Sequence, residues 1–122
     1  MAAEKIRFEA LPEDKINEKM SRWVTLGHHM SVAKYAMKRG AVAPSHQHPN
    51  EQVTFILEGR FRYTIDGKEV IVGPGELVFI PPNAVHQGEA IEDVVCVDFS
   101  SPPRTDMQAG TDPLKKLAAA KS

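Results

Sequence analysis

Short apolar runs alternate with turns that contain glycine or proline along most of the chain, and this alternation most limits the folds open to it. The runs are rich in β-branched and aromatic residues, which favour strands, and they recur at roughly ten-residue spacing. This pattern, without a long helical periodicity, is typical of an all-β sandwich or barrel. The expected strands are Met20–Leu26, Val32–Lys38, Gln52–Leu57, Leu77–Ile80 and Val94–Phe99, with a hairpin over 60–72.

The dipeptide Asp66-Gly67 is the clearest local signal in the chain. Asp-Gly favours a two-residue type I′ turn, and here it separates residues 60–65 from residues 68–72. One face of the resulting hairpin is then mostly apolar, and we expect that face to contact the core. The predicted cross-strand pairs are Ile65 with Lys68, Tyr63 with Val70 and Phe61 with Val72.

The two ends of the chain have weaker patterns. Leu11–Asp14 predicts a turn, and the N-terminal segment is expected to be largely irregular. The short C-terminal tail from Asp112 to Ser122 has helix propensity but little apolar surface, so we expect a weak helix or a frayed end. A length of 122 residues predicts a single domain over 1–122.

The composition argues against several classes of function. The formal net charge is −1, so no basic surface favours nucleic acid. No apolar leader follows Met1 and no long apolar segment is present, so we expect a cytoplasmic protein that does not bind membranes. The single cysteine, Cys96, permits no intrachain disulfide, and its apolar surroundings predict a buried side chain.

Two expected strands, Val53–Leu57 and Leu77–Ile80, are apolar on both faces. A single open sheet would leave one of those faces in water. A second sheet can cover one face and a partner subunit can cover part of the other. We therefore expect a homodimer.

The histidines suggest a metal site. In His46-Gln47-His48 the two imidazoles point to the same side if the segment is extended, and Gln52 follows shortly after. His86 lies in a distant segment, just past a pair of prolines. Neutral imidazole is a common ligand of first-row transition metals. The pair His28-His29 follows Gly27 and is expected to be a solvated loop.

The spacing of glycine, proline and histidine resembles the two motifs of the cupin family over about residues 31–100. The first is Gly40-(x5)-His46-x-His48-(x3)-Gln52-(x6)-Gly59, with Gln where Glu is usual. The second is Gly75-(x5)-Pro81-x-Asn83-(x2)-His86, with Asn83 where Gly is usual. The resemblance implies a double-stranded β-helix, or jelly-roll barrel. It also implies that His46, His48, Gln52 and His86 point into the barrel and bind one divalent transition metal, which would be nickel, zinc, manganese or iron.

Gln52 has chemical consequences in that ligand set. Its carbonyl oxygen is neutral, so the bound metal would keep its full charge and act as a stronger Lewis acid. The set also lacks the carboxylate that many iron oxygenases use. Glu51 could supply such a carboxylate; the alternative is that Glu51 is exposed or orients a histidine.

Four further residues are candidates for substrate chemistry. Asp98 lies in an apolar run and is either a buried general base or a hydrated strand-end carboxylate. Arg104 either binds a substrate carboxylate or lies on the surface. Tyr35 and Met37 share one face of a strand, so we expect them to point inward, as core residues or as the wall of a substrate site.

Among cupins, the pattern is similar to the small group that linearises unsaturated uronates, in which an Asp and an Arg follow the metal ligands with the spacing of Asp98 and Arg104. That similarity implies Lewis-acid isomerisation or ring opening of a small carboxylate- or carbonyl-bearing molecule. Two alternatives stay open: an iron-dependent dioxygenase that uses the same four ligands, and a non-catalytic cupin that binds a small ligand.

Overall fold

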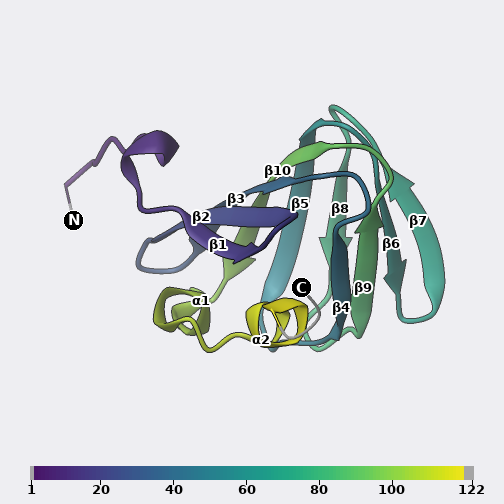
Figure 1. Ribbon diagram of the computed structural model, residues 1–122. Helices are drawn as coiled ribbons and strands as arrows, with labels where there is room; N and C mark the ends of the chain where they lie inside the picture. The colour runs from purple at the N-terminus through teal and green to yellow at the C-terminus, as the bar shows by residue number, and fades with distance from the viewer. Residues whose placement is uncertain (1, 120–122) are drawn as a thin grey trace.

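The computed structural model describes residues 2–119, which form two antiparallel β-sheets followed by two short helices (Figure 1). The six-stranded sheet has the order β1-β2-β3-β10-β5-β8, and its strands are β1 Asp14–Asn17, β2 Met20–Leu26, β3 Ser31–Met37, β10 Val94–Ser101, β5 Glu51–Glu58 and β8 Leu77–Ile80. The four-stranded sheet has the order β4-β9-β6-β7, and its strands are β4 Val42–His46, β9 His86–Ala90, β6 Phe61–Ile65 and β7 Lys68–Val72. A 3-10 turn, η1 Phe8–Ala10, precedes the sheets, and the helices are α1 Thr105–Ala109 and α2 Pro113–Ala119.

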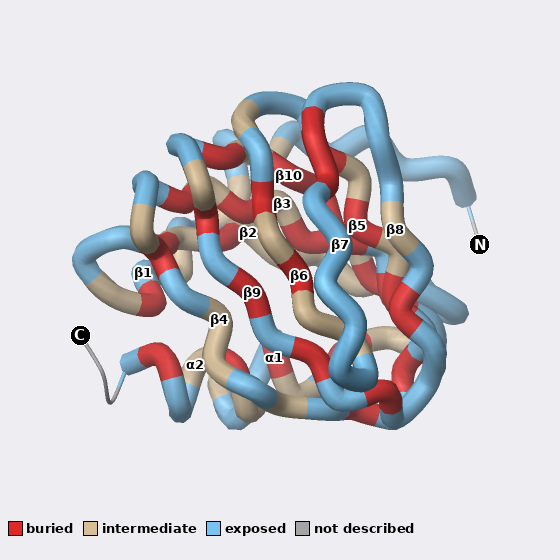
Figure 2. Tube along the Cα trace, turned by 90° about the vertical axis from the view of Figure 1, so that its right-hand side faces the viewer, coloured by how far each residue is buried: buried red, intermediate tan, exposed pale blue. Residues whose placement is uncertain are grey.

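The core lies between the inner faces of the two sheets (Figure 2). Along β3, every second residue from Ser31 to Met37 is buried, as a strand with one inward face requires. Tyr35 and Ile56 enter the core from the six-stranded sheet, and Phe61 enters it from the four-stranded sheet. The all-β fold class is therefore as expected, and the two sheets enclose the inward side chains.

The hairpin prediction is confirmed in its register. β6 pairs with β7 so that Ile65, Tyr63 and Phe61 lie opposite Lys68, Val70 and Val72. Asp66 and Gly67 have φ values of 47° and 81°, as a type I′ turn requires. On the apolar face Phe61, Tyr63 and Val72 are buried, whereas Val70 of the edge strand β7 is 37% exposed.

Several elements were not anticipated from the sequence. β1, β4, β9 and α1 carry no run of alternating apolar residues long enough to mark them. The expectation that the tail has little core-forming surface is wrong, since Leu114 and Ala118 of α2 belong to the core cluster. The part of the expected tail beyond residue 119 lies outside the described residues.

The C-terminal helices are fastened to the six-stranded sheet by a buried ion pair. α2 packs on β4 and β1, and α1 packs on β2 (Figure 1). Arg22 of β2 donates from Nη1 and Nη2 to the two carboxylate oxygens of Asp112, at 2.7 and 2.6 Å, and both side chains are fully buried. Arg22 Nε also donates to Asp14 at 2.9 Å, so the guanidinium links β1, β2 and the start of α2.

The outer face of the six-stranded sheet is only partly covered in the single chain. Leu77 and Phe79 of β8 are 52% and 62% exposed, whereas Ile80 on the opposite face is fully buried. Burial of β8 on both faces is therefore not achieved within one chain. Coverage by a second subunit stays a prediction. No helix among residues 2–119 has the length and apolar character needed to cross a membrane.

Candidate metal centre

Three histidines from two distant segments of the chain meet at one end of the barrel. His46 ends β4 and His86 begins β9, and the antiparallel register of these strands places the two residues opposite each other. His48 joins them from the loop between β4 and β5, with its ring centroid 5.0 Å from that of His86. One ring nitrogen from each histidine lies within 4.8 Å of the others, so this cluster could hold a metal ion.

Backbone carbonyls select the same tautomer for all three rings. Nδ1 of His46 lies 2.7 Å from the Pro44 oxygen, Nδ1 of His48 lies 3.1 Å from the Asn50 oxygen, and Nδ1 of His86 lies 2.9 Å from the Ala84 oxygen. A carbonyl oxygen only accepts, so each neutral ring must carry its proton on Nδ1. Each Nε2 is then left with an unprotonated lone pair, which is the form that binds a metal.

Burial keeps these rings neutral. It lowers the pKa of His46 and of His48 to about 4, and it also lowers the pKa of His86. The positive charge of Arg104 adds to the lowering at all three rings. At neutral pH no proton therefore competes for the Nε2 atoms.

Gln52 of β5 completes the group. Its Oε1 lies 3.0 Å from Nε2 of His48, and its amide nitrogen contacts Thr54 Oγ1 at 3.0 Å and Asp98 Oδ2 at 3.2 Å. Since His48 carries its proton on Nδ1, its Nε2 and the Gln52 oxygen face each other with lone pairs only. A cation that both atoms bind would relieve this repulsion, so the donor set fits a divalent metal. The roles of these four side chains as ligands stay predictions.

Asp98 is a buried carboxylate beside Gln52, so the hydrated strand-end alternative does not apply. It is 8% exposed, and the pairing of β10 with β5 places it opposite Thr54. Its Oδ1 accepts a hydrogen bond from the Thr54 hydroxyl at 2.7 Å. Burial raises the pKa of Asp98 to about 6, although the Thr54 bond and the charge of Arg104 lower it.

Arg104 is not a surface residue, since its side chain is 1% exposed. Nε and Nη2 donate to the two carboxylate oxygens of Asp106 at 2.9 and 3.0 Å, which orients the planar guanidinium. This two-bond fork to Asp106 leaves Nη1 of Arg104 for another partner. Arg104 lines the same cavity as His46, His86 and Asp98.

The cavity around these groups measures about 30 Å³, room for about two water molecules. Tyr35 and Met37 point inward and line it, as expected. The Tyr35 hydroxyl accepts from Arg22 Nη1 at 3.3 Å, so it is tied to the buried ion pair. Met107 of α1 and Leu114 of α2 close the cavity, and no sequence signal pointed to either of them.

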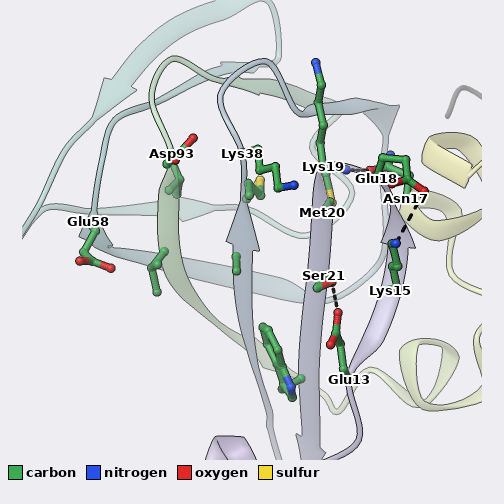
Figure 3. Close-up of a pocket in the computed structure, with 15 residues that line it drawn as sticks. Glu13, Lys15, Asn17, Glu18, Lys19, Met20, Ser21, Lys38, Glu58 and Asp93 are labelled. Carbon is green, nitrogen blue, oxygen red and sulfur yellow. Dashed lines mark hydrogen bonds and ion pairs between the residues drawn. The ribbon is translucent and has the colours of Figure 1, made fainter.

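Other candidates lie elsewhere. Glu51, His28 and His29 are exposed, and none of them lines this cavity. A groove of about 590 Å³ runs over the edge of the six-stranded sheet near β1, β2 and β3 (Figure 3). Lysines and carboxylates from β1, β5 and the adjoining turns face it, and no histidine lines it. Thr54, which bonds both Gln52 and Asp98, was not singled out from the sequence, because a threonine within a strand is ordinarily a strand former.

Comparison with known proteins agrees with this architecture. The model of the cupin domain family matches residues 33–99. An uncharacterized protein of Streptomyces coelicolor is 30% identical over 77 residues, which cover 62% of this chain and 73% of that protein. The structure of KdgF from Halomonas sp. superimposes with a TM-score of 0.81 and 23% identity, covering 87% of this chain and 99% of that one. An RmlC-like cupin from Shewanella frigidimarina gives a TM-score of 0.80 and 24% identity, covering 87% and 96% of the two chains.

The family match covers more than half of the chain, from within β3 to within β10, and includes the three histidines and Gln52. The structural likenesses independently establish the barrel fold. The chain therefore belongs to the cupin domain family.

Proposed function

We propose that this cupin is a metal-dependent enzyme that isomerises or ring-opens a small polar molecule bearing a carboxylate. The observation that carries the proposal is the arrangement within one cavity. A buried carboxylate, Asp98, and a buried guanidinium, Arg104, line the same small space as His46 and His86 of the histidine cluster. A proton carrier, an anion-binding group and a metal site are the parts that Lewis-acid isomerisation needs.

The ligand set favours charge stabilisation. His46, His48, Gln52 and His86 are all neutral, so a bound divalent ion keeps its full charge and supplies Lewis-acid polarisation of a substrate oxygen. Nickel, zinc, manganese and iron all accept imidazole ligands. The absence of a carboxylate among these four side chains separates the set from the iron triad of two histidines and one carboxylate.

Two side chains of the protein would supply proton transfer and substrate binding. Burial of Asp98 raises its pKa to about 6, which suits a group that accepts and returns a proton near neutral pH. Nη1 of Arg104 is free of the Asp106 fork and would bind a substrate carboxylate. The resemblance to uronate-linearising cupins makes a 4,5-unsaturated uronate the sharpest substrate hypothesis.

Ring opening of such a sugar balances without an oxidant or a co-reactant. Asp98 would take the proton of the anomeric hydroxyl, and the bond between the anomeric carbon and the ring oxygen would break to give an aldehyde and an enolate. The proton would then return from Asp98 to the enolate oxygen, which gives an enol. Tautomerisation of that enol to a ketone completes the isomerisation. Asp98 and Arg104 would act on the two sides of the ring oxygen, Asp98 at the anomeric hydroxyl and Arg104 at the carboxylate.

A sugar acid is larger than the cavity of about 30 Å³. Met107 and Leu114 form the part of its wall that comes from the C-terminal helices. We therefore propose that this wall moves outward when substrate enters and closes over it afterwards. The movement would exclude water from the site during the reaction.

The test is an assay of the metal-loaded protein on 4,5-unsaturated uronate monomers, followed by loss of the ultraviolet absorbance of the ring double bond. We expect product to form faster than in buffer. Asp98→Asn should lower kcat by roughly 10²- to 10⁴-fold, the usual contribution of a general base. Arg104→Met should mainly raise KM.

A rate equal to that in buffer would refute the uronate hypothesis. Oxygen uptake on an enol or phenol substrate by protein that holds iron would support the dioxygenase alternative. Metal content is measured for every variant, so that a lost metal is not mistaken for a lost proton carrier.

A further inference from the structure

We infer that Thr54 is a positioning residue that, with Asp98, fixes the Gln52 side-chain amide with its carbonyl oxygen toward the three histidines. This inference rests on the proposed metal site. An amide has a donor end and an acceptor end of nearly equal shape, and a half-turn exchanges them. Only the carbonyl end can bind a cation. Something must therefore select the orientation.

The buried surroundings of the amide nitrogen make that selection. Gln52 Nε2 lies 3.0 Å from Thr54 Oγ1 and 3.2 Å from Asp98 Oδ2. The Thr54 hydroxyl donates its single proton to Asp98 Oδ1 at 2.7 Å, so it presents only lone pairs to Gln52. An ionised Asp98 likewise only accepts. Both neighbours of the amide on this side are acceptors, and they require the NH2 end.

Tyr63 is the remaining hydrogen-bond partner of Thr54 in this network. Its hydroxyl lies 3.1 Å from Thr54 Oγ1. Because the Thr54 proton is already given to Asp98, Tyr63 must be the donor in this contact. The side chains of this network are all buried, with residue exposures of 6% or less for Gln52, Thr54 and Tyr63 and 8% for Asp98. Water therefore has little opportunity to replace a missing partner.

The opposite orientation would change the site. The Gln52 NH2 group would then face Nε2 of His48 and donate a hydrogen bond to its lone pair. That hydrogen bond would occupy the metal-binding atom of His48, and the metal-binding oxygen of Gln52 would point away from the histidines. A glutamate has two equivalent oxygens and needs no such selection. The Thr54 hydroxyl therefore matters because position 52 is glutamine rather than glutamate, and it selects whether that side chain favours or opposes the metal.

The test compares Thr54→Val with Thr54→Ser by metal titration and by the visible absorption spectrum of the Co²⁺-loaded protein. Valine keeps the shape of threonine without the hydroxyl, whereas serine keeps the hydroxyl. We expect Thr54→Val to weaken Co²⁺ and Zn²⁺ binding by about 10- to 100-fold, as for other residues that orient ligands. Its Co²⁺ spectrum should also change, while Thr54→Ser should stay close to the wild type on both readouts.

A double-mutant cycle separates positioning from general packing. In a Gln52→Met background no carbonyl is left to orient, so adding Thr54→Val should leave metal affinity unchanged. An equal loss in both backgrounds would overturn the inference, as would a Thr54→Val variant with wild-type affinity and spectrum. A wild-type protein that binds neither ion would overturn the proposed metal site itself. Circular dichroism of each variant shows that it is folded.

Discussion

Asp112→Ala is expected to lower the free energy of unfolding by about 3 kcal/mol, near the lower end of the range for breaking a buried ion pair. The substitution leaves the Arg22 guanidinium fully buried without its bidentate partner, which binds at 2.7 and 2.6 Å. The bond from Arg22 Nε to Asp14 remains, and the Asp14 side chain is 25% exposed. This residual partner places the expected cost at the low end of the range.

The assay is thermal unfolding of the metal-free protein. For a chain of this length, 1 kcal/mol corresponds to roughly 4 °C, so Tm should fall by about 12 °C. Glu18→Ala is the control, because its ion pair with Lys15 is exposed, with side-chain accessibilities of 86% and 59%. An exposed pair contributes about 0.5 kcal/mol or less, so that Tm should fall by no more than about 2 °C.

Equal shifts for the two variants would refute the reasoning. They would mean that Arg22 finds another partner when Asp112 is absent and that the buried pair does not fasten the C-terminal helices. Because Asp112 directly precedes α2, whose Leu114 closes the cavity, the variant should also open the metal site. Faster metal release from Asp112→Ala than from Glu18→Ala would confirm that link.

Three further predictions concern pH, metal and glycine. The pKa of His46 and of His48 falls from 6.5 to about 4 on folding, so the unfolded state binds more protons and metal-free stability should drop as pH falls from 6.5 towards 4. The pKa of Asp98 is raised to about 6, so its contribution to stability is lost as pH rises through that value and opposes the trend of the histidines. The two histidines together outweigh this one carboxylate. A Tm of the metal-free protein that does not depend on pH would contradict the account. Saturating metal at 100 times its Kd should raise stability by about 2.7 kcal/mol, and a chelator should reverse the gain in a thermal melt. Gly59→Ala should lower Tm more than Gly75→Ala does. The two glycines have similar φ values, +78° and +81°, but only at Gly59 would the new Cβ overlap a backbone carbonyl. Equal losses of Tm would show that φ alone matters.

Much of the barrel could be predicted because its strands carry local signals. The turn chemistry of Asp66-Gly67 predicts the register of one hairpin, and runs such as Val94–Phe99 predict central strands. β4 could not be predicted in this way. Its residues Val42–His46 include a proline and are mostly exposed or half-buried, and pairing with β9 is what holds them extended. Such pairing depends on residues distant in sequence.

The candidate site divides in the same way. The three histidines and Gln52 were predicted through motif spacing, and the structure brings these side chains together. The burial of Arg104 could not be predicted, because it depends on the helices that follow it and on the fork to Asp106. Thr54 has no local signal either, since its role depends on lying opposite Asp98 on the neighbouring strand.

The stoichiometry of bound metal tests the central claim most directly. Elemental analysis is made on purified wild type and on His86→Ala, with His28→Ala as a control that keeps the cluster and removes an exposed histidine. We expect one divalent transition-metal ion per chain in the wild type and the control, and its loss in His86→Ala. A wild type that binds no ion, or a His86→Ala variant that retains a full equivalent, would contradict that claim.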